Sequence, residues 1–173
     1  MKRLFRSLLL VLLLVPAVLS AQQRASAVPP PQSVLGFGAG ADGHLAAWSQ
    51  IVDYFGRLDR ASARVRVDTI GRTVQGRPMI LATITSPANQ ARLEAIRRGQ
   101  ARLADPRGAT PAELDRLVAS QPAVALIGAS LHGNEIMATQ MSMELAHDLA
   151  TDPALAPLLE NVVVLLVPGM NPD

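Results

Sequence analysis

The sequence lacks cysteine entirely, and aromatic residues make up only 3% of its 173 residues. Without cysteine the chain can form no disulfide bond and cannot carry a lipid on an N-terminal cysteine. Its stability must therefore come from an apolar core or from a bound metal. Charged residues are also few, at 17%, whereas 49% of the residues are hydrophobic. This composition is typical of one globular domain and excludes a disordered chain.

The N-terminus has the pattern of a secretory signal peptide. A basic start containing Lys2 and Arg3 precedes the apolar run "LLLVLLLV", which ends at Pro16. The run is shorter than the ~20 residues that a permanent membrane-spanning helix needs, so we expect the segment to be cleaved. Small residues suit cleavage after Ala21 or after Ala27, and the sequence does not choose between these sites.

Loss of the signal peptide, residues 1–27, changes the charge of the protein. The formal net charge of +2 includes Lys2, Arg3 and Arg6, so cleavage after Ala21 leaves a net charge of −1, and cleavage after Ala27, which also removes Arg24, leaves −2. This removes the electrostatic attraction to nucleic acid. We therefore expect an exported protein, periplasmic or extracellular, with no nucleic-acid partner and no stable membrane anchor after cleavage. The oligomeric state stays open.

A segment rich in proline and glycine follows the signal peptide. The stretch "VPPPQSVLGFGAG" shows no hydrophobic period, which indicates a polyproline-like linker followed by a loop over residues 28–41. We expect the folded domain to cover residues 42–173.

Hydrophobic periodicity in this domain predicts alternating helices and strands. Apolar residues recur at spacings of three and four from Leu45 to Leu58, which indicates an amphipathic helix with Trp48 and Phe55 in the core. Two β-rich runs around a glycine turn predict an antiparallel hairpin. The further elements expected are the hairpin strands Arg64–Gly71 and Met79–Thr85, helices at Asn89–Leu103, from Thr110, at Glu135–Ala150 and at Pro153–Glu160, and strands at Ala123–Ala129 and Val162–Pro168.

The last two strands are continuous apolar runs, "AVALIGA" and "VVVLLVP". Such runs are typical of strands that are buried on both faces of an α/β sheet. The helix between them predicts a right-handed crossover that makes the two strands parallel. Together with the hairpin, this predicts a three-layer α/β/α fold with a mixed sheet.

Polar residues follow each of these strands, as "SLHGNE" and as "GMNPD". Ligands of open α/β sheets bind beyond the carboxyl ends of the strands. His132 and Glu135 are separated by a short turn containing Gly133, so both side chains can reach one ion, and zinc accepts both kinds of ligand. Catalytic zinc uses three protein ligands, so this pair is only part of a site. Alternatively, Glu135 is a helix N-terminal carboxylate that the helix dipole favours.

The two other histidines do not complete the site. His44 lies near the start of the first helix. His147 belongs to a polar stripe that we expect to face solvent, formed by Gln140, Glu144, His147, Asp148 and Thr151.

Three motifs in the same order resemble the zinc carboxypeptidase family, that is, the carboxypeptidase A-like metallocarboxypeptidases of peptidase family M14. They are "GRTVQGRP", "GASLHGNE" and "LLVPGMNPD", and the resemblance runs from about Ser33 to Asp173. It implies that His132 and Glu135 are the first two zinc ligands. Asn134 stands where carboxypeptidase A-like members often carry a substrate-binding arginine, so it is a candidate substrate-binding residue.

The resemblance covers only the N-terminal part of such a domain. It implies that the third zinc ligand, a histidine, the substrate-binding arginines and the general-base glutamate all lie beyond Asp173. The fold would then be incomplete at its C-terminus, with no catalytic residue in this chain, and we expect residues 1–173 alone to have little activity.

The implied function is a secreted or periplasmic Zn²⁺-dependent carboxypeptidase that hydrolyses C-terminal residues from peptides. Two alternatives stay open. One is a zinc-dependent deacylase of N-acyl amino acids, because deacylases of the same fold also show "HGNE"; they tend to have "NPR" where this chain has Asp173, which favours the peptidase. The other is a non-catalytic exported binding domain with a vestigial His-Glu pair.

Overall fold

The computed structural model describes residues 28–173, so the predicted signal peptide lies outside the described residues. The strands are β1 (Val65–Arg72), β2 (Pro78–Ile84), β3 (Ala123–Gly128) and β4 (Val162–Val167). The α-helices are α3 (Pro31–Leu35), α4 (Trp48–Ala61), α5 (Pro87–Gln90), α6 (Leu93–Ala104), α7 (Pro111–Ser120), α8 (Ile136–Thr151) and α9 (Ala156–Asn161), with a 3-10 turn at Pro153–Leu155.

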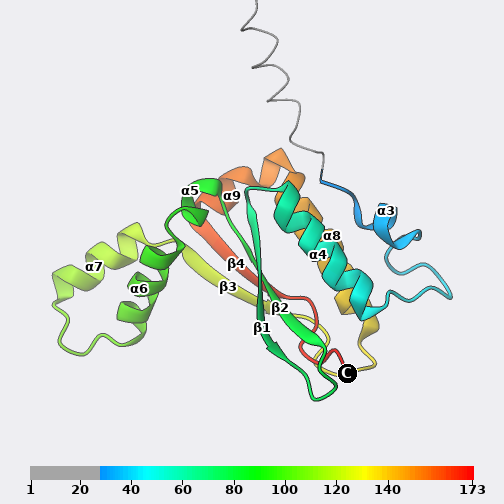
Figure 1. Ribbon diagram of the computed structural model, residues 1–173. Coiled ribbons are helices and arrows are strands. Elements are labelled where there is room, and N and C mark those ends of the chain that lie inside the picture. Colours follow the sequence, from blue (N-terminus) through cyan, green and yellow to red (C-terminus); the bar gives the residue numbers. More distant parts are fainter. Residues whose placement is uncertain (1–27) are drawn as a thin grey trace, which may run out of the picture.

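The four strands form one mixed sheet in the order β1-β2-β4-β3 (Figure 1). Strands β1 and β2 are the predicted antiparallel hairpin, and β2 also pairs antiparallel with β4. Strands β3 and β4 are parallel and are joined through α8, as a crossover connection requires. The predicted α/β class with a mixed sheet is confirmed.

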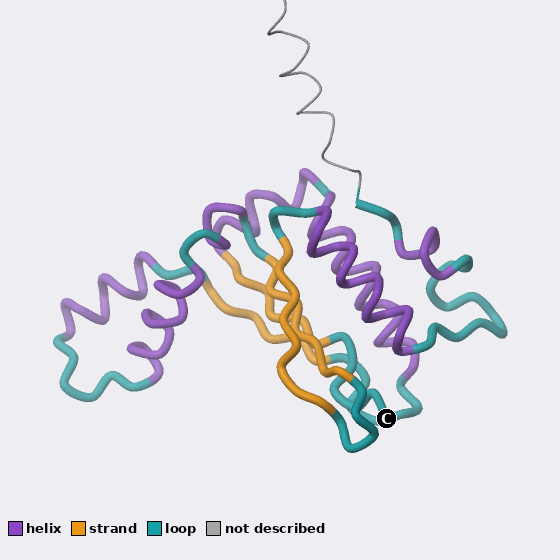
Figure 2. The backbone as a smooth tube through the Cα atoms, in the orientation of Figure 1, coloured by secondary structure: helices purple, strands orange, loops and turns teal. Residues whose placement is uncertain are grey.

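Helices α4 and α8 pack side by side and form a layer against the sheet (Figures 1 and 2). Phe55 and Leu58 of α4 are fully buried, and so are Met143 of α8 and Leu166 of β4. These side chains belong to one continuous core between the helices and the sheet. Burial of this apolar surface holds α8, and therefore the loop that precedes it, in place relative to the strands.

Trp48 lies at the margin of this core rather than inside it. Helix α4 begins at Trp48, so Leu45, expected in its apolar stripe, lies outside the helix with 57% of its surface exposed. The Trp48 indole Nε1–H donates a hydrogen bond of 2.9 Å to the carbonyl oxygen of Pro78. This bond fixes the start of α4 against the start of β2.

The interpretation of residues 28–41 as linker and loop does not describe all of this segment. It contains helix α3, and Leu35 is only 7% exposed because it packs into the main core. Proline at the start of α3 and Gly36 with a φ of 81° after it delimit the helix. Proline and glycine here mark helix ends rather than an unpacked chain.

Strand β3 was expected to be buried on both faces, and this expectation is wrong. Every residue of β3 is exposed, including Leu126 at 69%. The reason is its position at the edge of the sheet, where it pairs only with β4. The buried apolar run is β4, in which four of six residues are buried.

Helix α8 turns only part of its expected polar stripe to solvent, since Asp148 and Thr151 are exposed but the other members of the stripe are not. Gln140 is only 2% exposed, and the side chain of His147 is 21% exposed. Met137 and Met141 are instead about half exposed, at 47% and 51%. The orientation of α8 is set by its packing against α4, where Met143 and Ala146 are fully buried, so neighbouring polar residues are buried with them.

The helix expected at Asn89–Leu103 is divided into α5 and α6. Asn89 is 2% exposed and its side chain donates hydrogen bonds to Thr85, Leu159 and Glu160, which anchors α5 to the sheet. The helix expected from Thr110 is α7, and the Thr110 hydroxyl caps it by accepting a hydrogen bond from the Glu113 amide. Within residues 28–173, the helices are all too short or too polar to cross a bilayer.

Candidate active site at the sheet edge

The two polar segments that follow β3 and β4 lie beside each other, as their positions in the sequence predict. The Ala129 N–H donates to the Val167 carbonyl oxygen at 2.9 Å, and the Met170 N–H donates to that of Ala129 at 2.8 Å. The Asn171 N–H then donates to the Ser130 carbonyl oxygen at 3.2 Å. The parallel pairing of β3 and β4 thus continues beyond the strands and holds "SLHGNE" against "NPD".

His132 and Glu135 are in direct contact in the first of these segments. His132 Nδ1 lies 2.8 Å from Glu135 Oε1, and the His132 N–H donates to Glu135 Oε2 at 3.0 Å. Their side chains are 70% and 44% exposed. Hydrogen bonding from the His132 side chain, and then from its N–H, lowers the pKa of the Glu135 carboxyl. At neutral pH the Glu135 carboxylate is therefore ionised, and both side chains are open to solvent.

The other candidate residues lie apart from this contact. Asn134 is exposed in the turn between His132 and Glu135. His44 hydrogen-bonds the Asp42 carbonyl oxygen at 2.9 Å, and His147 lies 3.6 Å from the Asp148 carboxylate. In the part of the chain that the structure describes, no three His, Cys, Asp or Glu side chains gather as a metal site would require.

Asp173 connects the carboxyl ends of β3 and β4 to the hairpin. Its carboxylate accepts a hydrogen bond of 2.6 Å from the Thr73 hydroxyl and one of 3.1 Å from the Gln75 N–H. Arg77 lies 3.8 Å from the same carboxylate and also donates to the Pro172 carbonyl oxygen. The motifs "GRTVQGRP" and "NPD" are far apart in the sequence, so their contact was not predicted.

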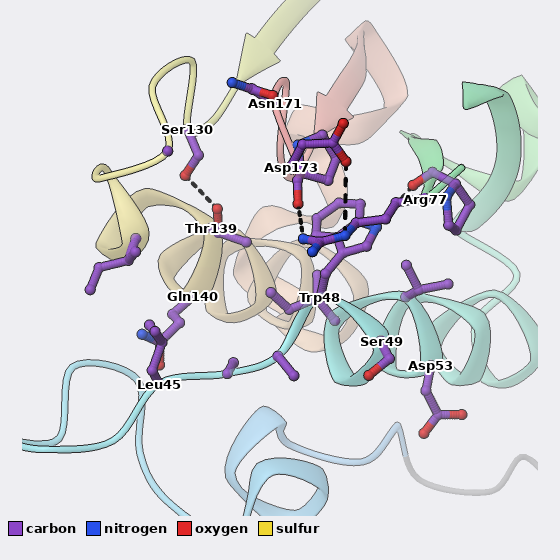
Figure 3. A pocket seen from close by; sticks show the side chains of 18 residues that line it. Leu45, Trp48, Ser49, Asp53, Arg77, Ser130, Thr139, Gln140, Asn171 and Asp173 are labelled. Carbon is purple, nitrogen blue, oxygen red and sulfur yellow. Dashed lines mark hydrogen bonds and ion pairs between the residues drawn. The ribbon is translucent and has the colours of Figure 1, made fainter. Parts of the chain in front are cut away.

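A cavity of about 810 Å³ adjoins the loop and is lined by the N-terminal ends of α4 and α8 and by the turn after β4 (Figure 3). Ser130 and Gly133 line it from the loop, whereas His132 and Glu135 are not among its lining residues. The Gln140 amide Oε1 is buried there without a hydrogen-bond partner among the described residues. Neither Ser130 nor Gln140 was predicted to line a candidate site, because neither residue type marks a site by itself.

A family model supports the resemblance that the motifs suggest. The model of the zinc carboxypeptidase family matches residues 51–173, which is most of the described chain. The chain belongs to the zinc carboxypeptidase family. The match includes both polar segments of the sheet edge, so the His132–Glu135 pair lies within the part of the chain that the family relationship covers.

Individual relatives agree with this assignment. Human carboxypeptidase D is 34% identical over 113 residues, which cover 62% of this chain and 8% of that protein. Mouse carboxypeptidase D is 32% identical over 118 residues, covering 62% of this chain and 7% of that protein. Carboxypeptidase A from Helicoverpa armigera shares the fold, with a TM-score of 0.53 at 19% identity. That superposition covers 83% of this chain and 31% of the crystal structure, so the chain spans under a third of these relatives.

The residues of this zinc carboxypeptidase chain fit part of a zinc site. Zinc takes imidazole nitrogen and carboxylate oxygen as ligands, and the lowered pKa of Glu135 keeps its carboxylate ionised and able to bind a cation. Both side chains are partly exposed, so neither must break buried contacts to turn toward an ion. Two ligands are one fewer than the three that catalytic zinc sites use.

Proposed function

We propose that the protein to which this chain belongs is an exported zinc metallocarboxypeptidase that hydrolyses C-terminal residues from peptides. In this proposal His132 and Glu135 are two of its zinc ligands, and Asn134 lies close enough to contact the substrate. Export, to a periplasm or to the outside of the cell, is proposed from the signal-peptide pattern of residues 1–27.

The observation that carries the proposal is the contact between His132 and Glu135 at the carboxyl edge of β3. The separation of 2.8 Å places a nitrogen and an oxygen ligand close enough to share one ion. The contact occurs where α/β folds bind their ligands, in a chain of the zinc carboxypeptidase family.

In this proposal His132 and Glu135 would bind the zinc ion. The ion would polarise a carbonyl group and activate water for hydrolysis. Glu135 contributes a negative charge that partly neutralises the cation. The exposed turn at Asn134 leaves the open side of the pair accessible to a peptide. The proposal needs a third ligand and a general base, which the resemblance assigns to residues beyond Asp173.

An assay of the full-length protein with two substrates tests this function. We expect it to release the C-terminal amino acid from a peptide, to lose this activity when a chelator removes zinc, and to regain it when zinc is restored. His132→Ala should abolish the activity, whereas His44→Ala, which removes an exposed histidine outside the pair, should not.

The same assay separates the alternatives. Hydrolysis of an N-acyl amino acid without release of amino acids from peptides would identify a deacylase and overturn the peptidase proposal. Absence of both activities in zinc-loaded, correctly folded protein would favour a binding domain.

A further inference from the structure

Ser130, two residues before His132, has an unusual backbone conformation. Its φ of 51° lies in the left-handed region, and among residues 28–173 it is the only residue other than glycine with a positive φ. A residue with a Cβ atom adopts this region only when its surroundings hold it there, and such residues concentrate at functional sites. The contacts of Ser130 show what holds it.

The Ser130 side chain bonds the loop to the first turn of α8. Its hydroxyl donates a hydrogen bond of 2.6 Å to the carbonyl oxygen of Glu135, and it also hydrogen-bonds the hydroxyl of Thr139 (Figure 3). Glu135 is the residue that precedes the first turn of α8. A single hydroxyl thus closes the loop 130–135 on itself and attaches it to the helix.

The Ser130 backbone bonds the same loop to the turn after β4. Its carbonyl oxygen accepts a hydrogen bond of 3.2 Å from the Asn171 N–H. The turn that contains Asn171 is itself bonded to the hairpin through Asp173. Ser130 is therefore bonded on one side to the helix and on the other side to the sheet edge. Ser130 makes both sets of bonds while its φ lies in the left-handed region.

We infer that Ser130 is a positioning residue for the His132–Glu135 pair. Its two sets of hydrogen bonds fix both ends of the loop, so the His132 ring and the Glu135 carboxylate meet before any ion binds. The effect on zinc affinity rests on the proposed function, whereas the effect on the loop does not.

Two substitutions separate the hydroxyl from the backbone conformation. Ser130→Gly accepts a positive φ without strain but removes the hydroxyl, and Ser130→Ala removes the hydroxyl and keeps the Cβ atom. Thr139→Val keeps the shape of Thr139 and removes one of the two partners. The matched control is Ser62→Gly, which removes a hydroxyl that accepts a hydrogen bond from Arg64 at the opposite edge of the sheet.

The experiment measures zinc affinity of the full-length protein by competition with a chelator, and amide hydrogen exchange of the metal-free protein. Residues that orient metal ligands typically contribute about 10- to 100-fold in metal affinity. We expect losses in this range for both Ser130 variants, a smaller loss for Thr139→Val and none for Ser62→Gly. The visible spectrum of a bound Co²⁺ ion should change in the Ser130 variants, because their ligands are held in a different geometry.

Hydrogen exchange decides the inference independently of the metal. In metal-free Ser130→Gly, the His132 and Glu135 amides, which bond within the loop, should exchange several-fold faster than in the wild type. Unchanged exchange at these amides, or zinc affinity and a Co²⁺ spectrum equal to those of the wild type, would overturn the inference. A wild-type protein that binds no zinc would overturn the proposed function alone, and the exchange rates would then decide the role of Ser130.

Discussion

At the scale of single residues, the pKa of Glu135 depends mainly on its neighbour His132. Hydrogen bonds from His132 lower its pKa below the ordinary value of 4.5. In His132→Ala we expect the pKa of Glu135 to return toward that value, measured by NMR titration of the metal-free protein. The pKa of Glu94, which hydrogen bonding from Arg97 lowers, is the control and should stay low. A Glu135 pKa that does not move in His132→Ala would contradict the contact.

The same shift has a consequence for stability. A carboxyl whose pKa is lower in the folded than in the unfolded state stabilises the fold fully above its unfolded pKa. This contribution is lost as the pH falls through the lowered pKa of Glu135. We therefore expect the difference in thermal stability between wild type and Glu135→Gln to be constant near neutral pH and to diminish below pH 4.5. A difference that grows on acidification would have the wrong sign.

Tyr54 is a second residue whose chemistry follows from its surroundings. Its ring is fully buried, its hydroxyl has no hydrogen-bond partner among the described residues, and burial raises its pKa. An unpartnered buried hydroxyl costs about 1–3 kcal/mol. Tyr54→Phe should therefore leave the free energy of unfolding unchanged or raise it by about 1 kcal/mol. Chemical denaturation measures this, and a loss of more than about 1 kcal/mol would reveal a partner for the hydroxyl.

At the scale of elements, Asn89 joins α5 to the strands and to α9. Its amide donates to the Thr85 hydroxyl and to the carbonyl oxygens of Leu159 and Glu160. Each hydrogen bond of this kind contributes about 0.5–1.5 kcal/mol, so Asn89→Ala, which removes all of them, should lower the free energy of unfolding by about 2–3 kcal/mol. Asn161→Ala removes an exposed asparagine and should change it by no more than about 0.5 kcal/mol. Equal effects of the two substitutions would contradict the role of Asn89.

The helices and strands were largely predictable, because their periods and caps are local properties. Two β-rich runs around a glycine turn indicated the hairpin, and the helix expected from Thr110 is α7. The sequence did not correctly predict which faces of α8 and β3 are buried. Burial of Gln140 and exposure of Leu126 depend on which elements pack against α8 and β3, and no local pattern carries that information.

The candidate site was predictable only in part for the same reason. His132 and Glu135 are close in sequence, so their contact could be expected. The hydrogen bond between Ser130 and Asn171 joins residues that are 41 positions apart in the sequence. The bond between Thr73 and Asp173 joins residues that are 100 positions apart. Such contacts follow from the order of the strands rather than from the residues themselves.

At the scale of the whole molecule, β3 is an edge strand with apolar side chains in solvent. Val124, Leu126 and Ile127 are 41%, 69% and 38% exposed. Exposed apolar edge strands promote association between chains. We expect residues 28–173, expressed alone, to associate with increasing concentration in analytical ultracentrifugation, and Leu126→Lys to shift them toward the monomer. Val74→Lys, at an exposed apolar residue outside β3, should have no such effect.

A monomer at all concentrations, or an equal effect of the two lysine substitutions, would show that β3 does not mediate association.

The proposed function depends on zinc binding by His132 and Glu135, and calorimetric titration of zinc into the metal-free, full-length protein tests this most directly. We predict one zinc ion per chain for the wild type. His132→Ala and Glu135→Ala should each weaken binding by more than about 100-fold, which exceeds the usual effect of losing a supporting hydrogen bond. Zinc binding of unchanged affinity in both variants would contradict the account, because the ion would then be held elsewhere.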